Sequence, residues 1–468
     1  MVPNPVEAER GQDGSDDLFS PGWFGASLPG GAAVVLDASV PGEPSAPSAA
    51  SISSAASVSS AASSLRGVLS SAFRAFLARR EDAPTVIAGY PWFLDWGRDT
   101  FIALRGEIAD GLSGAALDVL RKFGAFEDRV TLPNMIHGAD ASNRDTSDAP
   151  LWYCVVVADL LARRGRVAAE ARKLAPVVLR ILCGYLAGTP NGIRVDPASG
   201  LVYSPSHFTW MDTNFPAGTP REGYPVEIQA LWLRALALAA KLEPKGPWAA
   251  LREKAAASFL RLFWSPERGF LSDCLHAPGP VGSSVRRAGD SSPPPPAAAC
   301  VAADHLRCNQ LFAVTLGAVA PDHPAARAVV ASSERLLVPG AIRTLAPGRV
   351  RYELPIDGPS GRLNDPARPY WGRYEGDEDT RRKPAYHNGT AWPWPFPSYA
   401  EALVLVHGDS AREAAASLLS TALPLLEADC VGHLPEIMDG DAPHAGRGCD
   451  AQAWSASEFL RVAALLGL

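Results

Sequence analysis

The sequence predicts an all-α protein whose helices form an (α/α)6 barrel, preceded by a short irregular lead-in. Two observations predict this fold class. From residue 64 onward, apolar residues recur at intervals of three and four, which is the spacing of one helix face. The connections between the predicted helices alternate between long and short, as they would in a ring of helical hairpins.

The apolar spacing predicts twelve helices, with ends uncertain by about two to four residues. Their expected ranges are 65–80, 99–110, 113–126, 149–164, 168–187, 224–242, 248–263, 305–319, 323–336, 390–406, 409–427 and 452–467. The short connections include residues 110–113, 164–166 and 407–409. The long ones lead mostly into the even-numbered helices and cover residues 89–99, 133–148, 191–223, 270–304, 338–389 and 430–451. Such links would gather at one rim, where a rigid scaffold holds functional loops.

Residues 64–468 are therefore expected to form one catalytic barrel domain. Residues 1–63 are expected to be an N-terminal remnant with an Ala/Ser-rich linker, too short and too biased in composition for an independent domain. Residues 277–303, with four consecutive prolines at 293–296, are expected to form a disordered surface loop.

Composition restricts the classes of partner. The 468 residues carry a net charge of −7 with no basic cluster, which argues against nucleic acid and anionic membranes. The sequence contains no uninterrupted run of about 18 apolar residues, so we predict no membrane span. The seven cysteines are an odd number without metal-ligand spacing, and the N-terminus lacks the features of a signal peptide. We therefore expect a cytoplasmic protein with no cofactor and no metal site; oligomeric state is left open.

The long links repeat one kind of composition, which is clearest at residues 90–100 (YPWFLDWGRDT). This stretch combines four aromatic rings, two carboxylates and an arginine, a mixture that suits a polar ligand with apolar faces. Sugars are such ligands, because their ring faces pack on tryptophan and their hydroxyl groups bind charged side chains. Glycoside hydrolysis needs two carboxyl groups, but sequence spacing alone cannot choose the pair.

Structural alternatives are open at several of these positions. Asp99 could act as the N-cap of the helix that follows it. Glu227 could form a structural ion pair with Arg221. Asp212 could be a turn residue, and Glu436 a carboxylate that braces its loop.

Six motifs in this order resemble the glycogen debranching family, in particular its amylo-α-1,6-glucosidase domain, over about residues 80–468. The motifs are YPWFLDWGRDT at 90–100, TWMD at 209–212, PREGYPVEIQALW at 220–232, RCNQLF at 307–312, HNGTAWPW at 387–394, and LPEIMDGD to AQAWS at 434–455.

The resemblance implies a glucoamylase-like barrel and an inverting enzyme that releases single glucose units from α-1,6 branch points of glycogen-type glucans. Asp212 would be the general acid and Glu436 the general base. The residues expected to bind substrate are Trp96, Arg98, Asp99, Trp210, Arg221, Glu227, Asn388, Trp392, Gln452 and Trp454. Related exo-acting glucosidases of the same fold, acting on α-1,4 bonds or small oligosaccharides, are the nearest alternative. A sugar epimerase and a non-catalytic glycan-binding protein are further alternatives.

Overall fold

A computed structural model of the chain describes residues 2–3, 15–16, 58–80, 83–137, 140–213, 219–278 and 294–468. Its contacts divide the chain into two units, residues 1–61 and 62–468. In the first unit, Val2–Pro3 (β1) pairs antiparallel with Ser15–Asp16 (β2). Most of the predicted proline-rich loop, residues 279–293, lies outside the described residues.

The described chain is mostly helical, as predicted. Its α-helices are α2 (Val58–Arg74), α3 (Gly97–Ala109), α4 (Ser113–Ala125), α5 (Ala149–Leu161), α6 (Arg166–Ala171), α7 (Ala175–Ala187), α8 (Val226–Leu242), α9 (Trp248–Phe263), α10 (Leu311–Thr315), α11 (Pro324–Ser333), α12 (Lys383–Tyr386), α13 (Phe396–His407), α14 (Arg412–Ser420), α15 (Leu423–Leu426) and α16 (Ala453–Leu466). Short 3-10 turns are η1 (Arg172–Leu174), η2 (Ala297–Ala299), η3 (Cys308–Gln310), η4 (Glu334–Leu336) and η6 (Gly408–Ala411), and η5 (Glu378–Arg382) is a π-helix.

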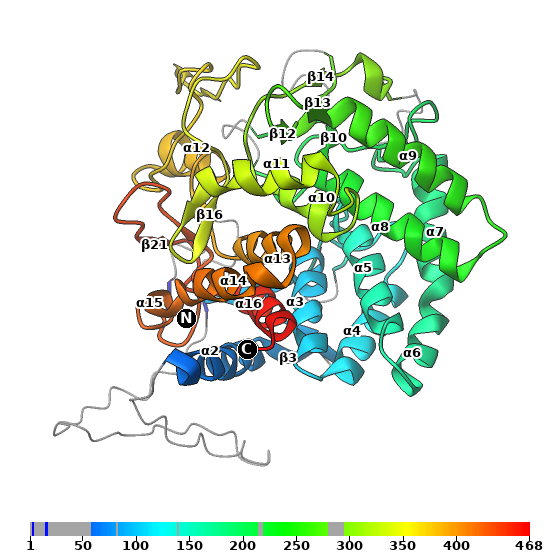
Figure 1. Cartoon of the computed structure of the whole chain (residues 1–468), viewed down its shortest axis with the longest axis horizontal. Coiled ribbons are helices and arrows are strands. Elements are labelled where there is room, and N and C mark those ends of the chain that lie inside the picture. Colours follow the sequence, from blue (N-terminus) through cyan, green and yellow to red (C-terminus); the bar gives the residue numbers. More distant parts are fainter. Residues whose placement is uncertain are drawn as a thin grey trace. The chain divides into compact units, whose positions relative to one another are not determined.

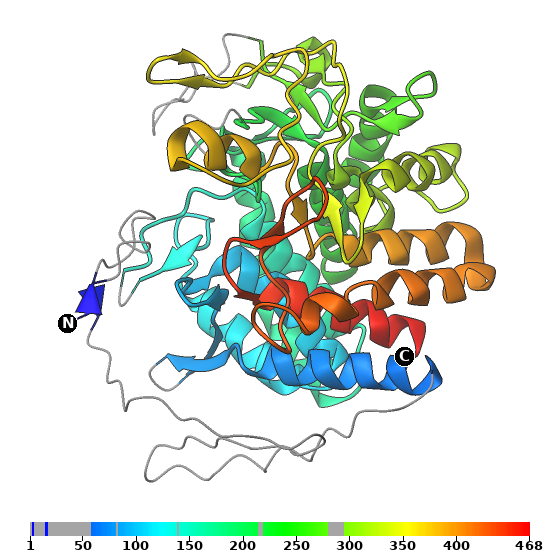
Figure 2. The same cartoon turned by 90° about the vertical axis from the view of Figure 1, so that its left-hand side faces the viewer.

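Six of these helices follow one another in space (Figure 1). Helix α3 packs against α5, α5 against α8, α8 against α10, α10 against α13, α13 against α16, and α16 against α3. Other helices pack outside them; α13 and α14, both orange, lie side by side in Figure 2. The side chains between the helices form one large hydrophobic cluster. Among the described helices, none is long and apolar enough to cross a membrane.

Several predicted helix boundaries are wrong, and each has a local cause. The first helix ends at Arg74, because residues 77–80 pair as a strand with residues 83–86. This tertiary pairing overrides the helix propensity of the sequence LARR. The tenth begins at Phe396 and not at residue 390, since Pro393 and Pro395 interrupt the segment and Gly389 has φ +155°.

The other differences are breaks within predicted helices. The fifth is divided into α6, η1 and α7, with Pro176 in the first turn of α7. The eighth contracts to η3 and α10 and stops before Gly317, which has φ +75°. The eleventh is divided into η6, α14 and α15, with Pro424 in the first turn of α15.

Short strands, which were not predicted, brace the long links. They are β3 (Leu77–Arg80), β4 (Ala83–Val86), β5 (Gly89–Tyr90), β6 (Asp95–Trp96), β7 (Met135–Ile136), β8 (Arg194–Val195), β9 (Val202–Tyr203), β10 (Gly223–Pro225), β11 (Trp264–Ser265), β12 (Phe270–Leu271), β13 (Cys274–His276), β14 (Val301–Ala302), β15 (Leu337–Val338), β16 (Ala341–Arg343), β17 (Asp357–Gly358), β18 (Gly361–Arg362), β19 (Ala391–Trp392), β20 (Ile437–Met438), β21 (Gly446–Arg447) and β22 (Ala451–Gln452).

Two sheets fix the links that matter for the site. The largest has five strands in the order β15-β16-β19-β20-β21, so the link before α13 lies beside the link before α16. Strand β22 pairs antiparallel with β5, with Gln452 opposite Gly89 and Ala451 opposite Tyr90. The predicted stretch at residues 90–100 is therefore joined directly to the last long link.

Candidate active site

The first turn of α3 carries Arg98 and Asp99, both almost fully buried. Arg98 Nε donates to Asp148 Oδ2 at 2.7 Å, and Arg98 Nη1 donates to Asp212 Oδ2 at 3.1 Å. Arg98 Nη2 is buried and has no hydrogen-bond partner among the described residues. The Arg98 guanidinium thus joins the links before α5 and α8 to α3. Its Nη2 is still available to donate a hydrogen bond to a ligand.

Asp99 lies within α3, which begins at Gly97, so the interpretation of Asp99 as the N-cap is wrong. Its Oδ1 accepts a hydrogen bond from Gln452 Nε2 at 3.2 Å. Burial raises the pKa of Asp99 to about 8; Arg98 opposes this rise, and the nearby charges of Asp212 and Glu436 add to it. Asp99 in α3, Asp212 in the link before α8 and Glu436 in the link before α16 are thus near enough for their charges to interact.

Asp212 lies in the link before α8, and its side chain keeps 34% exposure. The protein around the Asp212 carboxyl group shields it from water, and this desolvation raises its pKa above the ordinary aspartate value. The ion pair with Arg98 acts in the opposite direction. A carboxyl group that is partly open to solvent and has a raised pKa holds its proton to higher pH than an ordinary aspartate, which favours its delivery to a ligand.

Glu436 is fixed just before strand β20 and is 2% exposed. The hydroxyl of Tyr386 donates to Glu436 Oε1, and the Cys449 amide donates to Oε2 at 2.8 Å. The Cys449 thiol also lies 2.7 Å from Gln452 Oε1. Glu436 is thus oriented from the links before α13 and α16.

The predicted aromatic walls divide into two groups. Trp210, Trp392 and Trp454 are buried and belong to one cluster: Trp210 meets Trp392 edge to face at 5.2 Å, and Trp392 meets Trp454 at 6.0 Å. Tyr386, which binds Glu436, also packs on Trp392 at 5.0 Å. Trp96 lies apart, is half-buried, and its Nε1 has no hydrogen-bond partner among the described residues.

Arg221 and Glu227 form a buried ion pair, which is the structural alternative considered for them. Arg221 Nη2 lies 2.6 Å from Glu227 Oε2, and Arg221 Nε lies 2.8 Å from Asp273 Oδ2. Arg221 Nη1 also donates to Thr209 Oγ1 at 3.0 Å, which ties this pair to the link that carries Asp212. These contacts show how the pair supports the link; direct contact of either residue with substrate stays a prediction.

Asn388 is also fully buried and engaged by the protein. Its Oδ1 accepts from Arg307 Nη2 at 2.8 Å, and its Nδ2 donates to the Pro384 carbonyl at 3.0 Å. Arg307 also donates to the Thr344 carbonyl at 3.2 Å. The Arg307–Asn388 pair therefore locks the link before α13 to the start of η3.

Sequence reasoning missed several residues of the site. Asp148, at the N-terminus of α5, holds Arg98; an aspartate directly before Ala149-Pro150 was a visible helix-start signal. Tyr386 and Cys449 carry no sequence signal for their contacts with Glu436. Among the described residues, no group of three or more His, Cys, Asp and Glu side chains could hold a metal ion.

Comparison with known proteins agrees with this helical architecture. A family model described as amylo-alpha-1,6-glucosidase matches residues 71–461. The glycogen debranching enzyme of Saccharomyces cerevisiae is 23% identical over 414 residues, and the match covers 70% of this chain and 26% of the yeast protein. The chain therefore spans about a quarter of that relative.

Solved structures share the fold at low sequence identity. A glycosidase in complex with glucose superposes with a TM-score of 0.55 and 14% identity, covering 88% of this chain and 99% of that one. A GH63 mannosylglycerate hydrolase from Thermus thermophilus, also in complex with glucose, gives a TM-score of 0.55 and 17% identity, covering 85% and 99%.

Proposed function

The chain belongs to the amylo-alpha-1,6-glucosidase family, and from this premise we propose that it releases single glucose units from α-1,6 branch points of glycogen-type glucans. It is a glycoside hydrolase of this family type. The observation that carries the proposal is the convergence of Asp99, Asp212 and Glu436 beside Arg98. Two carboxyl groups are the minimum for glycoside hydrolysis.

We infer further that residues 64–468 form an (α/α)6 barrel and act as one catalytic domain, preceded by a non-catalytic lead-in. The succession of contacts from α3 through α5, α8, α10, α13 and α16 back to α3 supports this inference. The candidate side chains come from the links that enter α3, α5, α8, α13 and α16, which is where a barrel would gather them.

In the proposed mechanism, Asp212 donates its proton to the glycosidic oxygen while the bond to C1 breaks. Glu436 removes a proton from a water molecule that attacks C1 from the opposite face, so the configuration inverts. The raised pKa of Asp212 supports its role as the acid. The hydrogen bonds from the Tyr386 hydroxyl and the Cys449 amide, which orient Glu436, support its role as the base.

Arg98 and Trp96 are the side chains that we propose to hold the terminal glucose, with Asp99 and Gln452 beside them. Arg98 Nη2 and Trp96 Nε1 are buried donors without a partner among the described residues. A sugar hydroxyl would satisfy each of them, and an unsatisfied buried donor is otherwise costly.

Two substrates, a branched dextrin and α-glucosyl fluoride, distinguish the role of Asp212 as the acid from that of Glu436 as the base. Asp212→Asn and Glu436→Gln should each lower hydrolysis of a branched dextrin by at least about a hundredfold. On α-glucosyl fluoride, whose leaving group needs no protonation, the Asp212→Asn enzyme should recover most of its rate and Glu436→Gln should not. If Glu436→Gln recovers and Asp212→Asn does not, the two roles are reversed; near-normal rates in both variants on dextrin would refute the pair.

Substrate choice is tested by glucose release from a branched dextrin trimmed to single α-1,6-linked glucosyl stubs, compared with a linear maltodextrin. We expect faster release from the trimmed dextrin, with β-glucose appearing first by NMR. Faster release from maltodextrin would assign the site to an α-1,4-acting exo-glucosidase. Initial α-glucose would exclude inversion.

A further inference from the structure

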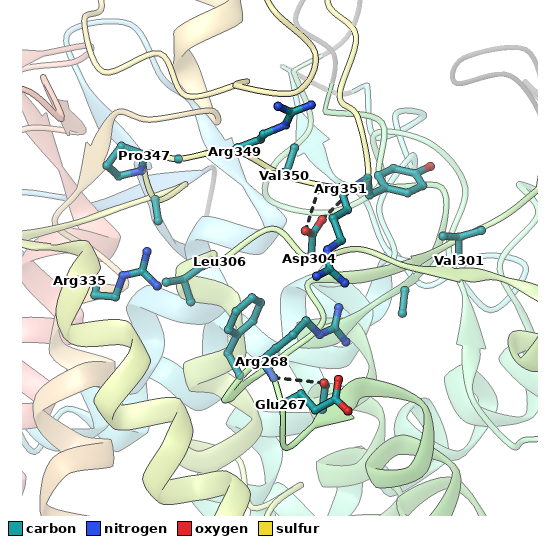
Figure 3. Close-up of a pocket in the computed structure, with 16 residues that line it drawn as sticks. Glu267, Arg268, Val301, Asp304, Leu306, Arg335, Pro347, Arg349, Val350 and Arg351 are labelled. Carbon is teal, nitrogen blue, oxygen red and sulfur yellow. Dashed lines mark hydrogen bonds between the residues drawn. The ribbon is translucent and has the colours of Figure 1, made fainter.

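A cavity with its own set of lining residues is shown in Figure 3. It encloses about 690 Å³ and is lined by the β11–β12 hairpin, residues 301–306, Arg335 and residues 346–352. This lining includes none of the residues that bind Asp99, Asp212 or Glu436. Small-molecule sites occupy about 300–1,000 Å³, so the cavity has room for a metabolite-sized ligand.

Four arginines line this cavity: Arg268, Arg335, Arg349 and Arg351. Among the described residues, none of the four has a carboxylate within ion-pair distance. Elsewhere arginines such as Arg98, Arg221 and Arg461 are paired with carboxylates at 2.7–3.1 Å or closer. The protein as a whole is acidic, with a net charge of −7. This cavity is therefore a positively charged region on a protein whose net charge is negative.

The two acidic residues of the lining, Asp304 and Glu267, are too few to neutralise its four arginines. Asp304 uses both carboxylate oxygens on backbone amides, those of Arg351 at 2.8 Å and Tyr352 at 3.0 Å. Glu267 is exposed and, within the described part of the chain, forms no ion pair with these arginines. The lining therefore carries two more positive than negative side chains.

The wall that carries Arg351 is held in place from several sides. The Tyr352 ring stacks on the buried His276 ring at 4.3 Å, and the Tyr352 carbonyl lies 2.8 Å from His305 Nε2. The Ala346 amide donates to the Leu306 carbonyl at 2.9 Å. These contacts hold the backbone of residues 346–352 in place without a ligand, so binding would not have to order this segment.

Arg268 forms part of the opposite wall. Its Nη1 donates to the Ala303 carbonyl at 3.0 Å, its Nη2 donates to Ser272 Oγ at 2.7 Å, and its guanidinium lies over the Phe270 ring. Figure 3 shows the Arg268 and Arg351 side chains turned toward the same central space, with Arg335 across the cavity. Burial lowers the pKa of Arg268, Asp304 opposes this effect, and the charge of Arg351 adds to it.

We propose that this cavity is a second ligand site, which binds the phosphate group of a small phosphomonoester such as a sugar phosphate. A phosphomonoester carries a charge of about −1.5 to −2 at pH 7, which matches the excess positive charge of the lining. Its three terminal oxygens can accept hydrogen bonds from arginines on different walls, and guanidinium groups suit phosphate geometry. A carboxylate would leave part of this charge unmatched.

Calorimetric titration of the full chain tests the proposal. Glucose 6-phosphate and inorganic phosphate are the probes, added at low ionic strength in saturating glucose so that any glucose site is already filled. The variants are Arg351→Gln and Arg335→Gln, whose side chains are exposed, and the matched control is Arg164→Gln, an exposed arginine outside the cavity. Thermal unfolding of each variant checks that the fold is intact.

We expect saturable binding that weakens about tenfold or more in Arg351→Gln and in Arg335→Gln, because each removes a charge-assisted contact. Arg164→Gln should bind within about twofold of wild type. Tighter binding of the sugar phosphate supports a sugar phosphate as occupant, and equal binding of both probes supports free phosphate. Absence of saturable binding, or affinity unchanged in both cavity variants, overturns the proposal.

Discussion

Glu107 allows a quantitative test of the helical core. It lies on α3, is 0% exposed, and neither of its carboxylate oxygens has a hydrogen-bond partner among the described residues. Burial alone raises the pKa of Glu107 to about 8. The perturbation is Glu107→Gln, which keeps the shape of the side chain and removes its ionisation.

The magnitude follows from the shift in pKa. Between the ordinary glutamate value of 4.5 and about 8, folded Glu107 holds a proton that the unfolded chain has lost. Wild-type stability therefore falls as pH rises through this window. About 3.5 pH units at about 1.4 kcal/mol each give an upper figure of about 5 kcal/mol. The glutamine variant has no such loss, so its stability relative to wild type should rise with pH, by about 4 kcal/mol over the roughly 3 units between pH 5 and pH 8.

The assay is urea unfolding of both proteins at pH 5 and pH 8.5, followed by tryptophan fluorescence. Glu458, on the neighbouring helix α16, supplies the control because it is equally buried but paired with Arg461 at 2.7 Å. Burial would raise the pKa of Glu458, but Arg461 and Arg105 outweigh it and lower the pKa. Glu458→Gln breaks a buried pair and should cost about 3–5 kcal/mol at both pH values.

One outcome would refute this reasoning about Glu107. If the stability difference between Glu107→Gln and wild type is the same at pH 5 and pH 8.5, the carboxyl group does not titrate as a buried, unpaired acid. A pH-dependent difference for Glu107→Gln together with a constant one for Glu458→Gln is the expected pattern.

Three further predictions concern the site. Tyr386→Phe should lower kcat on dextrin by about tenfold or more, since it removes the hydrogen bond that the Tyr386 hydroxyl donates to Glu436, and near-normal kcat would contradict this. The pH profile of kcat/KM should decline at higher pH than the ordinary aspartate value allows, because burial raises the pKa of Asp212, and it should change again near pH 8, where Asp99 ionises; a decline at the ordinary aspartate value would contradict the raised pKa of Asp212. Gly389→Ala should lower thermal stability clearly, as its Cβ would lie 2.5 Å from the Trp371 backbone at φ +155°, whereas Gly317→Ala, with open space around it, serves as the milder control.

The helical pattern was predictable because apolar spacing directly reflects which face of a helix is buried. Residues 113–126 and 248–263 match α4 and α9 closely, since both helices have a clear apolar stripe. Residues 77–80 were not predictable as a strand, because their conformation depends on pairing with residues 83–86. Propensity alone does not include that partner.

The site was predictable in composition but not in geometry. Aromatic and acidic motifs marked the links that contain Asp99, Asp212 and Glu436. The partners of these residues come from across the chain, as with Arg98 and Asp148 or Glu436 and Tyr386. A single sequence contains no information on which distant side chains meet.

The pairing of β22 with β5 has a consequence for how the protein is made. Gln452 and Asp99, joined by a hydrogen bond, are separated by 353 positions in the chain. A ribosome must therefore add 353 residues after Asp99 before this residue can acquire its partner. Contacts of such sequence separation form slowly, and the waiting segments expose apolar surface. A nascent chain that stops before β22 would carry Asp99 and Asp212 but lack both Gln452 and α16, the helix that packs on α3.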